Sequence, residues 1–179
     1  MKMQHIVFVH SAGVQSVTSG SNPLIRKTKE DIPDYTWHAS DYPRDVGQIY
    51  DNWVKVLIQS LDEVPIDEPV ILIGHSFGGT VITKYLTENT VQHNIEKVIM
   101  IGSPFFGCDE KFSDPQNIIT DELKVAAPIY HIQSEDDDRV NINHQKCWQE
   151  KFPEIQLITE QSGKHEFHDG IQALNQLLN

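Results

Sequence analysis

The stretch PVILIGHSFGGTVITKYL, residues 69–86, places a single serine between a strand pattern and a helix pattern. It starts with a short apolar run, passes through Gly-His-Ser-Phe-Gly at residues 74–78, and ends in a helical pattern of apolar residues. A Gly-x-Ser-x-Gly pentapeptide between a strand and a helix is typical of a sharp turn that holds a serine hydroxyl above a sheet. The small glycines avoid collisions between the turn and its neighbours. Ser76 is therefore a candidate nucleophile.

The pentapeptide alone also fits a glycine-rich turn with an idle serine. The strand before it and the helix after it favour the nucleophile, because this context is the one that the motif requires. The first turn of the following helix directs backbone N–H groups toward the serine. Negative charge would develop there during attack on a carbonyl, so the N–H of Phe77 is a candidate oxyanion donor.

Other apolar runs along the chain resemble strands buried on both faces, as in parallel sheets covered by helices. These runs occupy residues 6–9, 70–73, 98–101 and 129–132, with weaker candidates at 35–38 and 155–158. Helical periodicity is found in residues 47–61, 80–86, 143–152 and 168–178. Alternating strands and helices predict an α/β fold with a mostly parallel central sheet.

We expect a single domain spanning residues 1–179, because this length suits one core. The longest irregular span covers residues 102–128, which is too short for a large cap domain, although loops of that length are often functional.

The composition limits the classes of partner. The formal net charge of −12, with no block rich in Lys or Arg, argues against nucleic acid. The N-terminal apolar run is too short for a signal peptide, and no segment is long enough to span a membrane. Cys108 and Cys147 lie far apart without CxxC spacing, so we expect reduced thiols, with a single bridge as the alternative. The chain is expected to be cytoplasmic.

A serine nucleophile needs a base, and the base works best when a carboxylate orients it. Among nine histidines, His165 lies between the last predicted strand and the last helix. The acidic cluster at residues 135–138 follows the strand at 129–132. Loops after parallel strands meet at one edge of a sheet, so these groups should gather near Ser76. His75 adjoins the nucleophile, but its side chain should point away, which favours a packing role.

With these residues the chain resembles the α/β-hydrolase superfamily, and in particular the small serine hydrolases related to the retinoblastoma-binding serine hydrolase. The resemblance covers nearly the whole chain, from residues 10–13 to the GKHEF segment. It implies a three-layer α/β-hydrolase fold and the chain order Ser, acid, His. The family's segment after the penultimate strand places its catalytic Asp three residues before an apolar position. Here that position is Val140, which selects Asp137, with Asp136 as the alternative.

Two departures from the family pattern affect these assignments. Ser134 and Asn141 stand where the family usually has Gly and Pro. The end segment resembles Gly-His-Phe with Lys164 inserted, which indicates His165 as the base in preference to His168.

The segment at residues 10–13 resembles the His-Gly-x-Gly loop that supplies the second oxyanion donor, with Ser11 in place of the first glycine. The resemblance indicates the N–H of Ala12 as that donor, with Ser11 as the second choice. We also place Ser11 among the substrate-binding residues. Phe105 and Phe106, with Phe112 nearby, are either an acyl pocket or a plug of the core.

The expected function is hydrolysis of a small or mid-sized carboxylic ester, or of an amide or short peptide, through an acyl-enzyme on Ser76. No cofactor and no metal are required, and the acidic run after residue 135 lacks the Gly and Glu of a calcium loop. One alternative is a catalytically silent protein-binding module on the same fold. Another is an acyltransferase with the same three residues.

Overall fold

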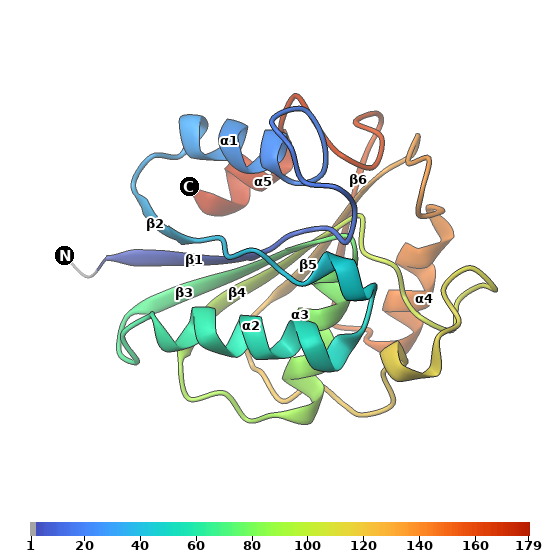
Figure 1. Ribbon diagram of the computed structural model, residues 1–179, viewed down its shortest axis with the longest axis horizontal. Coiled ribbons are helices and arrows are strands. Elements are labelled where there is room, and N and C mark those ends of the chain that lie inside the picture. Colours follow the sequence, from blue (N-terminus) through green and yellow to red (C-terminus); the bar gives the residue numbers. More distant parts are fainter. Residues whose placement is uncertain (1–2) are drawn as a thin grey trace.

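The computed structural model describes residues 3–179, and its centre is one six-stranded sheet (Figure 1). Every pair of neighbouring strands is parallel, and the strand order is β2-β1-β3-β4-β5-β6. The strands are β1 (Gln4–Val9), β2 (Tyr35–His38), β3 (Pro69–His75), β4 (Asn94–Ile101), β5 (Ile129–Ser134) and β6 (Gln156–Glu160). All six predicted strands are confirmed.

Helices cover both faces of the sheet and make a three-layer structure (Figure 1). One face packs against α1 (Asn22–Asp31) and α5 (Gln172–Leu178). The other face packs against α2 (Tyr50–Asp62), α3 (Phe77–Glu88) and α4 (Asn143–Lys151). The predicted α/β architecture is therefore confirmed, and residues 3–179 contain no cap domain.

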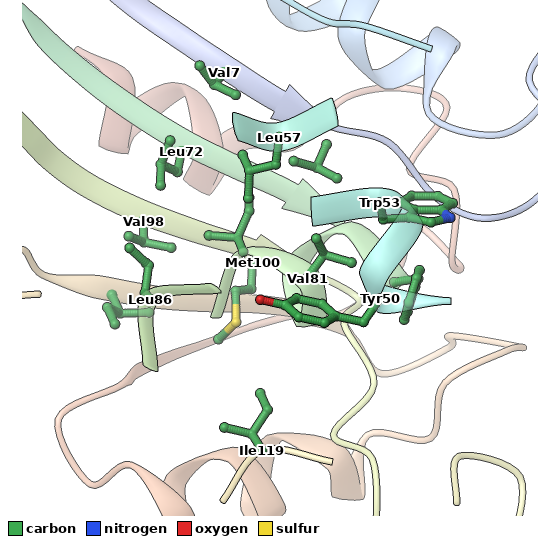
Figure 2. Packing of buried hydrophobic residues seen from close by; sticks show 14 of the residues in the cluster. Val7, Tyr50, Trp53, Leu57, Leu72, Val81, Leu86, Val98, Met100 and Ile119 are labelled. Atoms are coloured by element: carbon green, nitrogen blue, oxygen red, sulfur yellow. The ribbon is translucent and has the colours of Figure 1, made fainter. Parts of the chain in front are cut away.

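The core divides into two apolar clusters because successive strand residues point to opposite faces. In β3, Leu72 joins the cluster below α2 and α3, whereas Ile73 joins the cluster below α1 and α5. Figure 2 shows the first cluster, in which Trp53 and Leu57 of α2 lie over the central strands. Since both faces are covered, the strands are continuous apolar runs, as the sequence indicated.

Helix α1 was missed by the sequence analysis, and three helix starts differ from the predicted ones. Helix α3 begins at Phe77, α2 at Tyr50 and α5 at Gln172. The span at residues 102–128 is irregular, as expected, apart from one 3-10 turn at Pro115–Asn117. Within residues 3–179, no helix has the length and apolar character needed to cross a bilayer.

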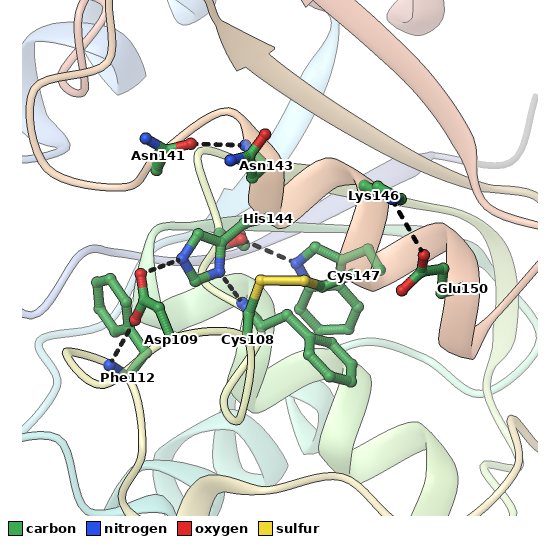
Figure 3. Close-up of a disulfide and its surroundings, with 12 residues drawn as sticks. Cys108, Asp109, Phe112, Asn141, Asn143, His144, Lys146, Cys147 and Glu150 are labelled. Atoms are coloured by element: carbon green, nitrogen blue, oxygen red, sulfur yellow. Dashed lines mark hydrogen bonds and ion pairs between the residues drawn. A yellow bond between two sulfur atoms is a disulfide. The ribbon is translucent and has the colours of Figure 1, made fainter.

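The expectation of reduced thiols is wrong, because Cys108 and Cys147 form a disulfide with Cα atoms 6.0 Å apart (Figure 3). The residues lie 39 positions apart in the sequence. The loop after β4 folds back onto α4, and this return brings them together. Disulfides persist mainly in oxidising compartments, so the cysteines no longer support the cytoplasmic location that we expected.

Candidate active site

Ser76 lies at the turn between β3 and α3, where the sequence predicted a sharp elbow. Its backbone has φ 54° and ψ −126°, a left-handed conformation that is rare for residues other than glycine. The turn is held by a hydrogen bond of 2.7 Å from the Ser76 N–H to the carbonyl oxygen of Ile101. The side chain is thereby fixed at the carboxyl edge of the sheet.

The glycines of the elbow allow very close backbone contacts. A Cβ atom on Gly78 would lie 2.1 Å from the carbonyl oxygen of Val9, at the end of β1. A Cβ atom on Gly74 would lie 2.4 Å from the backbone nitrogen of Gly79. Both distances are far below any real contact, so only glycine lets α3 approach β1 and β3 this closely.

Asp137 and His165 are hydrogen-bonded to each other across the loops that follow β5 and β6. His165 Nδ1 lies 3.0 Å from Asp137 Oδ2 and 3.1 Å from Oδ1. Asp137 Oδ1 also accepts the N–H groups of Arg139 and Val140, each at 2.8 Å. Burial alone would raise the pKa of Asp137, but His165 and these two N–H groups hold it below its ordinary value. The carboxylate is therefore ionised and oriented toward the imidazole.

The alternative acid, Asp136, has a different contact. Its Oδ1 accepts the backbone N–H of Lys164 at 2.8 Å, while Ser134 Oγ donates to the carbonyl oxygen of Lys164 at 2.8 Å. Lys164 itself adopts a left-handed conformation with φ 50°. Asp136 and Ser134 thus anchor the residue that precedes His165, and Ser134 makes this contact at a departure from the family pattern.

A cavity of about 270 Å³ brings several of these groups together. Ser76 and His165 both line it, as do Ser11 and Ala12 from the loop after β1. Its other walls include Lys111, Phe112, Arg139, Val140 and Glu166. A larger cavity of about 610 Å³ shares Arg139 and Glu166 with it, so the two are neighbours.

The structure separates the two candidate oxyanion donors of the loop after β1. The N–H of Ser11 donates to Ser21 Oγ at 2.8 Å and is thus engaged inside the protein. For Ala12, whose residue lines the cavity, no hydrogen bond of the N–H lies within residues 3–179. Phe77 begins α3, so its N–H has no acceptor within the helix. These geometries favour Ala12 over Ser11.

The phenylalanines of the irregular span lie mainly in the core. Phe106 is buried against Phe77 and Phe112, with edge-on rings. Phe105 packs edge-on against Trp148 of α4. Neither is among the residues that line the 270 Å³ cavity, whereas Phe112 is. The core-plug alternative therefore describes Phe105 and Phe106, and the cavity wall comes from Phe112.

Figure 3 shows the disulfide together with Asp109, Phe112 and His144. Close to Cys108, His144 of α4 accepts the Phe105 N–H at its Nδ1, 3.0 Å away. Its Nε2 therefore carries the hydrogen and donates to Asp109 Oδ2 at 3.0 Å. The ring of Phe112 lies edge-on to His144. The loop that carries Lys111 and Phe112 is thus fastened to α4 by one covalent bond and two hydrogen bonds.

Gly102 is a site residue that sequence reasoning missed. It has φ +53°, and a Cβ atom there would lie 3.3 Å from both Asp137 Oδ2 and His165 Nδ1. The only sequence signal was its position directly after the strand at residues 98–101, the same relation to a strand that Ser76 has. The glycine leaves room for the Asp137–His165 pair.

A family model described as serine hydrolase matches residues 37–179. The chain belongs to the serine hydrolase family. No sequence among the curated proteins matches this one. The fold is shared with a putative YdeN-like hydrolase of Pectobacterium atrosepticum, at 17% identity and a TM-score of 0.72, covering 98% of this chain and 89% of that one.

Two further structures have the same fold. The ydeN gene product of B. subtilis is 18% identical with a TM-score of 0.70, and the match covers 99% of this chain and 97% of the other. The methylesterase MES16 of Arabidopsis is 18% identical with a TM-score of 0.68, covering 98% and 97%. The family match and these folds confirm the α/β-hydrolase superfamily.

Proposed function

We propose that this serine hydrolase cleaves small carboxylic esters through an acyl-enzyme on Ser76. The observation that carries the proposal is the buried Asp137–His165 pair beside a cavity that Ser76 also lines. A serine on a strained elbow, an imidazole and an ionised carboxylate that fixes the imidazole are the three parts that acyl transfer needs.

In the first half-reaction, Ser76 Oγ attacks the carbonyl carbon while His165 Nε2 accepts the hydroxyl proton. Asp137 keeps the hydrogen of the neutral imidazole on Nδ1 and stabilises the imidazolium that forms. The N–H groups of Phe77 and Ala12 hold the oxyanion, and losing one such donor typically costs about 3–4 kcal/mol of transition-state stabilisation. His165 then gives its proton to the leaving alcohol, and the C–O bond breaks.

In the second half-reaction, water attacks the acyl-Ser76 carbonyl and His165 accepts a proton from it. Collapse of the second tetrahedral intermediate releases the carboxylic acid and returns the proton to Ser76. Every step moves protons among Ser76, His165, alcohol and water, so this mechanism requires neither a metal nor an organic cofactor.

The size of the cavity favours a short acyl group. A volume of about 270 Å³ lies just below the range of about 300–1,000 Å³ that is usual for small-molecule sites. The neighbouring cavity, with Arg139 and Glu166 between the two, offers room for a larger alcohol. The rim is polar, with Lys111, Arg139 and Glu166 exposed or half-buried.

The test is hydrolysis of p-nitrophenyl acetate, butyrate and laurate by wild type and Ser76→Ala, with mass spectrometry of the quenched enzyme. We expect turnover of acetate and butyrate, little of laurate, and a transient acyl group on Ser76. Folded wild type that hydrolyses none of the three would contradict the proposal and favour the silent protein-binding module. Added alcohols separate the acyltransferase, because ester exchange would then exceed hydrolysis.

A further inference from the structure

A chain of buried hydrogen bonds runs beneath Ser76 and joins the loop after β1 to the loop after β6. His75 is fully buried, and its Nδ1 lies 2.8 Å from Ser21 Oγ. Its Nε2 lies 2.7 Å from the backbone carbonyl oxygen of His165. Ser21 Oγ in turn accepts the Ser11 N–H at 2.8 Å. Three hydrogen bonds thus connect Ser11 to His165 through Ser21 and His75.

The chemistry of the end groups fixes the direction of each bond. A carbonyl oxygen only accepts, so Nε2 of His75 carries the hydrogen and donates to His165. The Ser11 N–H only donates, so Ser21 Oγ accepts it and gives its own hydrogen to Nδ1 of His75. Burial lowers the pKa of His75 to about 3, which keeps the imidazole neutral as this pattern requires.

Further hydrogen bonds hold the carbonyl oxygen of the Ser11–Ala12 peptide. Gln15 Nε2 donates to the Ser11 carbonyl oxygen at 2.9 Å. Gln15 Oε1 accepts the Ser21 N–H at 2.7 Å, so this side chain joins both ends of the loop. In a trans peptide the C=O and the N–H point in opposite directions. Anchoring the Ser11 oxygen therefore also fixes the direction of the Ala12 N–H.

His10 adds a second donor to the same oxygen. Its Nε2 accepts the Tyr42 N–H at 2.9 Å, so its Nδ1 carries the hydrogen and donates to the Ser11 oxygen at 2.7 Å. Burial lowers the pKa of His10 and favours the neutral ring that these two bonds need. The peptide that carries the oxyanion donor is thus held by two side chains.

We propose that Ser21 and His75 are positioning residues. They fix the direction of the Ala12 N–H and the position of the His165 backbone relative to Ser76. The proposal rests on the function proposed above and adds two residues that do not line the cavity of Ser76. Oxyanion stabilisation depends on donors whose direction is set before the reaction. His75 directly precedes Ser76 in the sequence. The series of hydrogen bonds therefore couples the loop that carries the oxyanion donor, the nucleophile and the base. The acceptor nitrogen of His75, Nδ1, already accepts the hydrogen of Ser21 Oγ, so His75 has no free nitrogen that could accept a proton from Ser76. His165 therefore remains as the base.

The first experiment needs no variant and no activity. Nitrogen-15 NMR of the histidine-labelled wild type reports the tautomer of each ring. We expect His75 at about pH 6 to be neutral with its hydrogen on Nε2, as the acceptor at His165 requires. A His75 with the hydrogen on Nδ1, or a cationic His75, would overturn the hydrogen-bond chain.

The second experiment compares Ser21→Ala with Ser16→Ala. Ser16 lies in the same loop, but its Oγ contacts Ser19 Oγ at 2.7 Å and takes no part in the hydrogen bonds that join Ser11 to His165. It is therefore a matched control. We measure kcat and KM for p-nitrophenyl acetate and the inhibition constant of a trifluoromethyl ketone, whose adduct carries an oxyanion. For Ser21→Ala we expect a kcat about tenfold lower, an inhibition constant about tenfold higher and KM within about twofold. Ser16→Ala should match wild type, and Ser21→Thr, which keeps the hydroxyl, should recover most of the loss.

The outcomes separate this proposal from the proposed function. A folded Ser21→Ala with wild-type kcat and inhibition constant overturns the positioning role while leaving the hydrolase intact. Should Ser21→Ala not fold, His75→Gln replaces it, because its amide N–H can still donate to the His165 oxygen while no acceptor remains at the position of Nδ1. Unchanged kcat in that variant also overturns the proposal. Wild type that neither hydrolyses the ester nor binds the ketone overturns the proposed function, and the positioning role with it.

Discussion

Asp137 and His165 form a buried pair whose side chains are only 1% and 5% exposed. His165 lines the same cavity as Ser76, so in the proposed mechanism the geometry of the pair controls reactivity at Ser76. Asp136, one residue earlier, instead binds the backbone of Lys164. Two neighbouring carboxylates therefore have different tasks, and substitution can separate them.

Asp137→Asn should reduce kcat by about ten-thousandfold, because an amide can donate to Nδ1 and so stabilise the wrong imidazole tautomer. Asp136→Asn is the matched control, since its amide oxygen can still accept the Lys164 N–H. We expect that variant to stay within about threefold of wild type. Steady-state kinetics with p-nitrophenyl acetate measure both. The assignment of the acid is wrong if the two variants exchange these effects.

Gly78→Ala should destabilise the fold by about 3 kcal/mol or more, because the new Cβ would strike the Val9 carbonyl oxygen, a backbone atom that cannot turn aside. Gly13→Ala is the control, since nothing lies within 4 Å of a Cβ at that position. It should change the free energy of unfolding by less than about 0.5 kcal/mol. Urea denaturation followed by circular dichroism measures both, and equal stabilities would contradict the close packing of the elbow.

The disulfide should stabilise the protein chiefly by restricting the unfolded chain. For cysteines 39 positions apart, the loop-closure argument gives about 4 kcal/mol. We expect Cys108→Ser with Cys147→Ser to lower the melting temperature by about 10 °C. Reductant should lower that of wild type similarly and leave the double variant unchanged. Titration of two free thiols in native, unreduced protein would contradict the bond.

Two fully buried histidines, His75 and His131, should make stability depend on pH. Burial lowers the pKa of His75 to about 3 and that of His131 to about 4, against about 6.5 in an unfolded chain. Below about pH 6.5 the unfolded chain binds protons that the folded chain does not. The stabilisation is therefore complete above about pH 6.5 and is lost as the pH falls toward 4.

The expected loss is about 1.4 kcal/mol per pH unit for each histidine. Urea titrations at about pH 7, 6 and 5 measure the slope. His131→Gln, whose amide can still donate to the Ser103 carbonyl oxygen, should show a shallower slope than wild type. Equal free energies of unfolding across this range would show that the two rings are not buried as described.

Local patterns were sufficient to predict the sheet, because all six strands are covered on both faces or are bounded by turn residues. They failed for α1, which has few apolar residues, such as Leu24, among many charged ones. Pro23 in its first turn was the available signal of a helix start. The starts of α2 and α5 shifted because an irregular backbone precedes each helix.

The site was predictable wherever a motif had a fixed place after a strand, as with Ser76 and the loops that carry Asp137 and His165. The contacts that organise these loops depend on the folded arrangement. Ser21 and His75 are 54 positions apart in the sequence, and no local pattern links them. The same reason hid the disulfide. Tertiary packing of irregular loops brings such pairs together.

Labelling with a fluorophosphonate probe, which reacts with activated serines, tests most directly whether Ser76 is a nucleophile. Wild type, Ser76→Ala and His165→Ala are treated in parallel, and the modified residue is located by mass spectrometry. We predict one label per wild-type chain, on Ser76, with none on Ser76→Ala and labelling of His165→Ala slowed by orders of magnitude. Folded wild type that takes up no label, or a label that persists without Ser76, would contradict the assignment of Ser76 as an activated nucleophile.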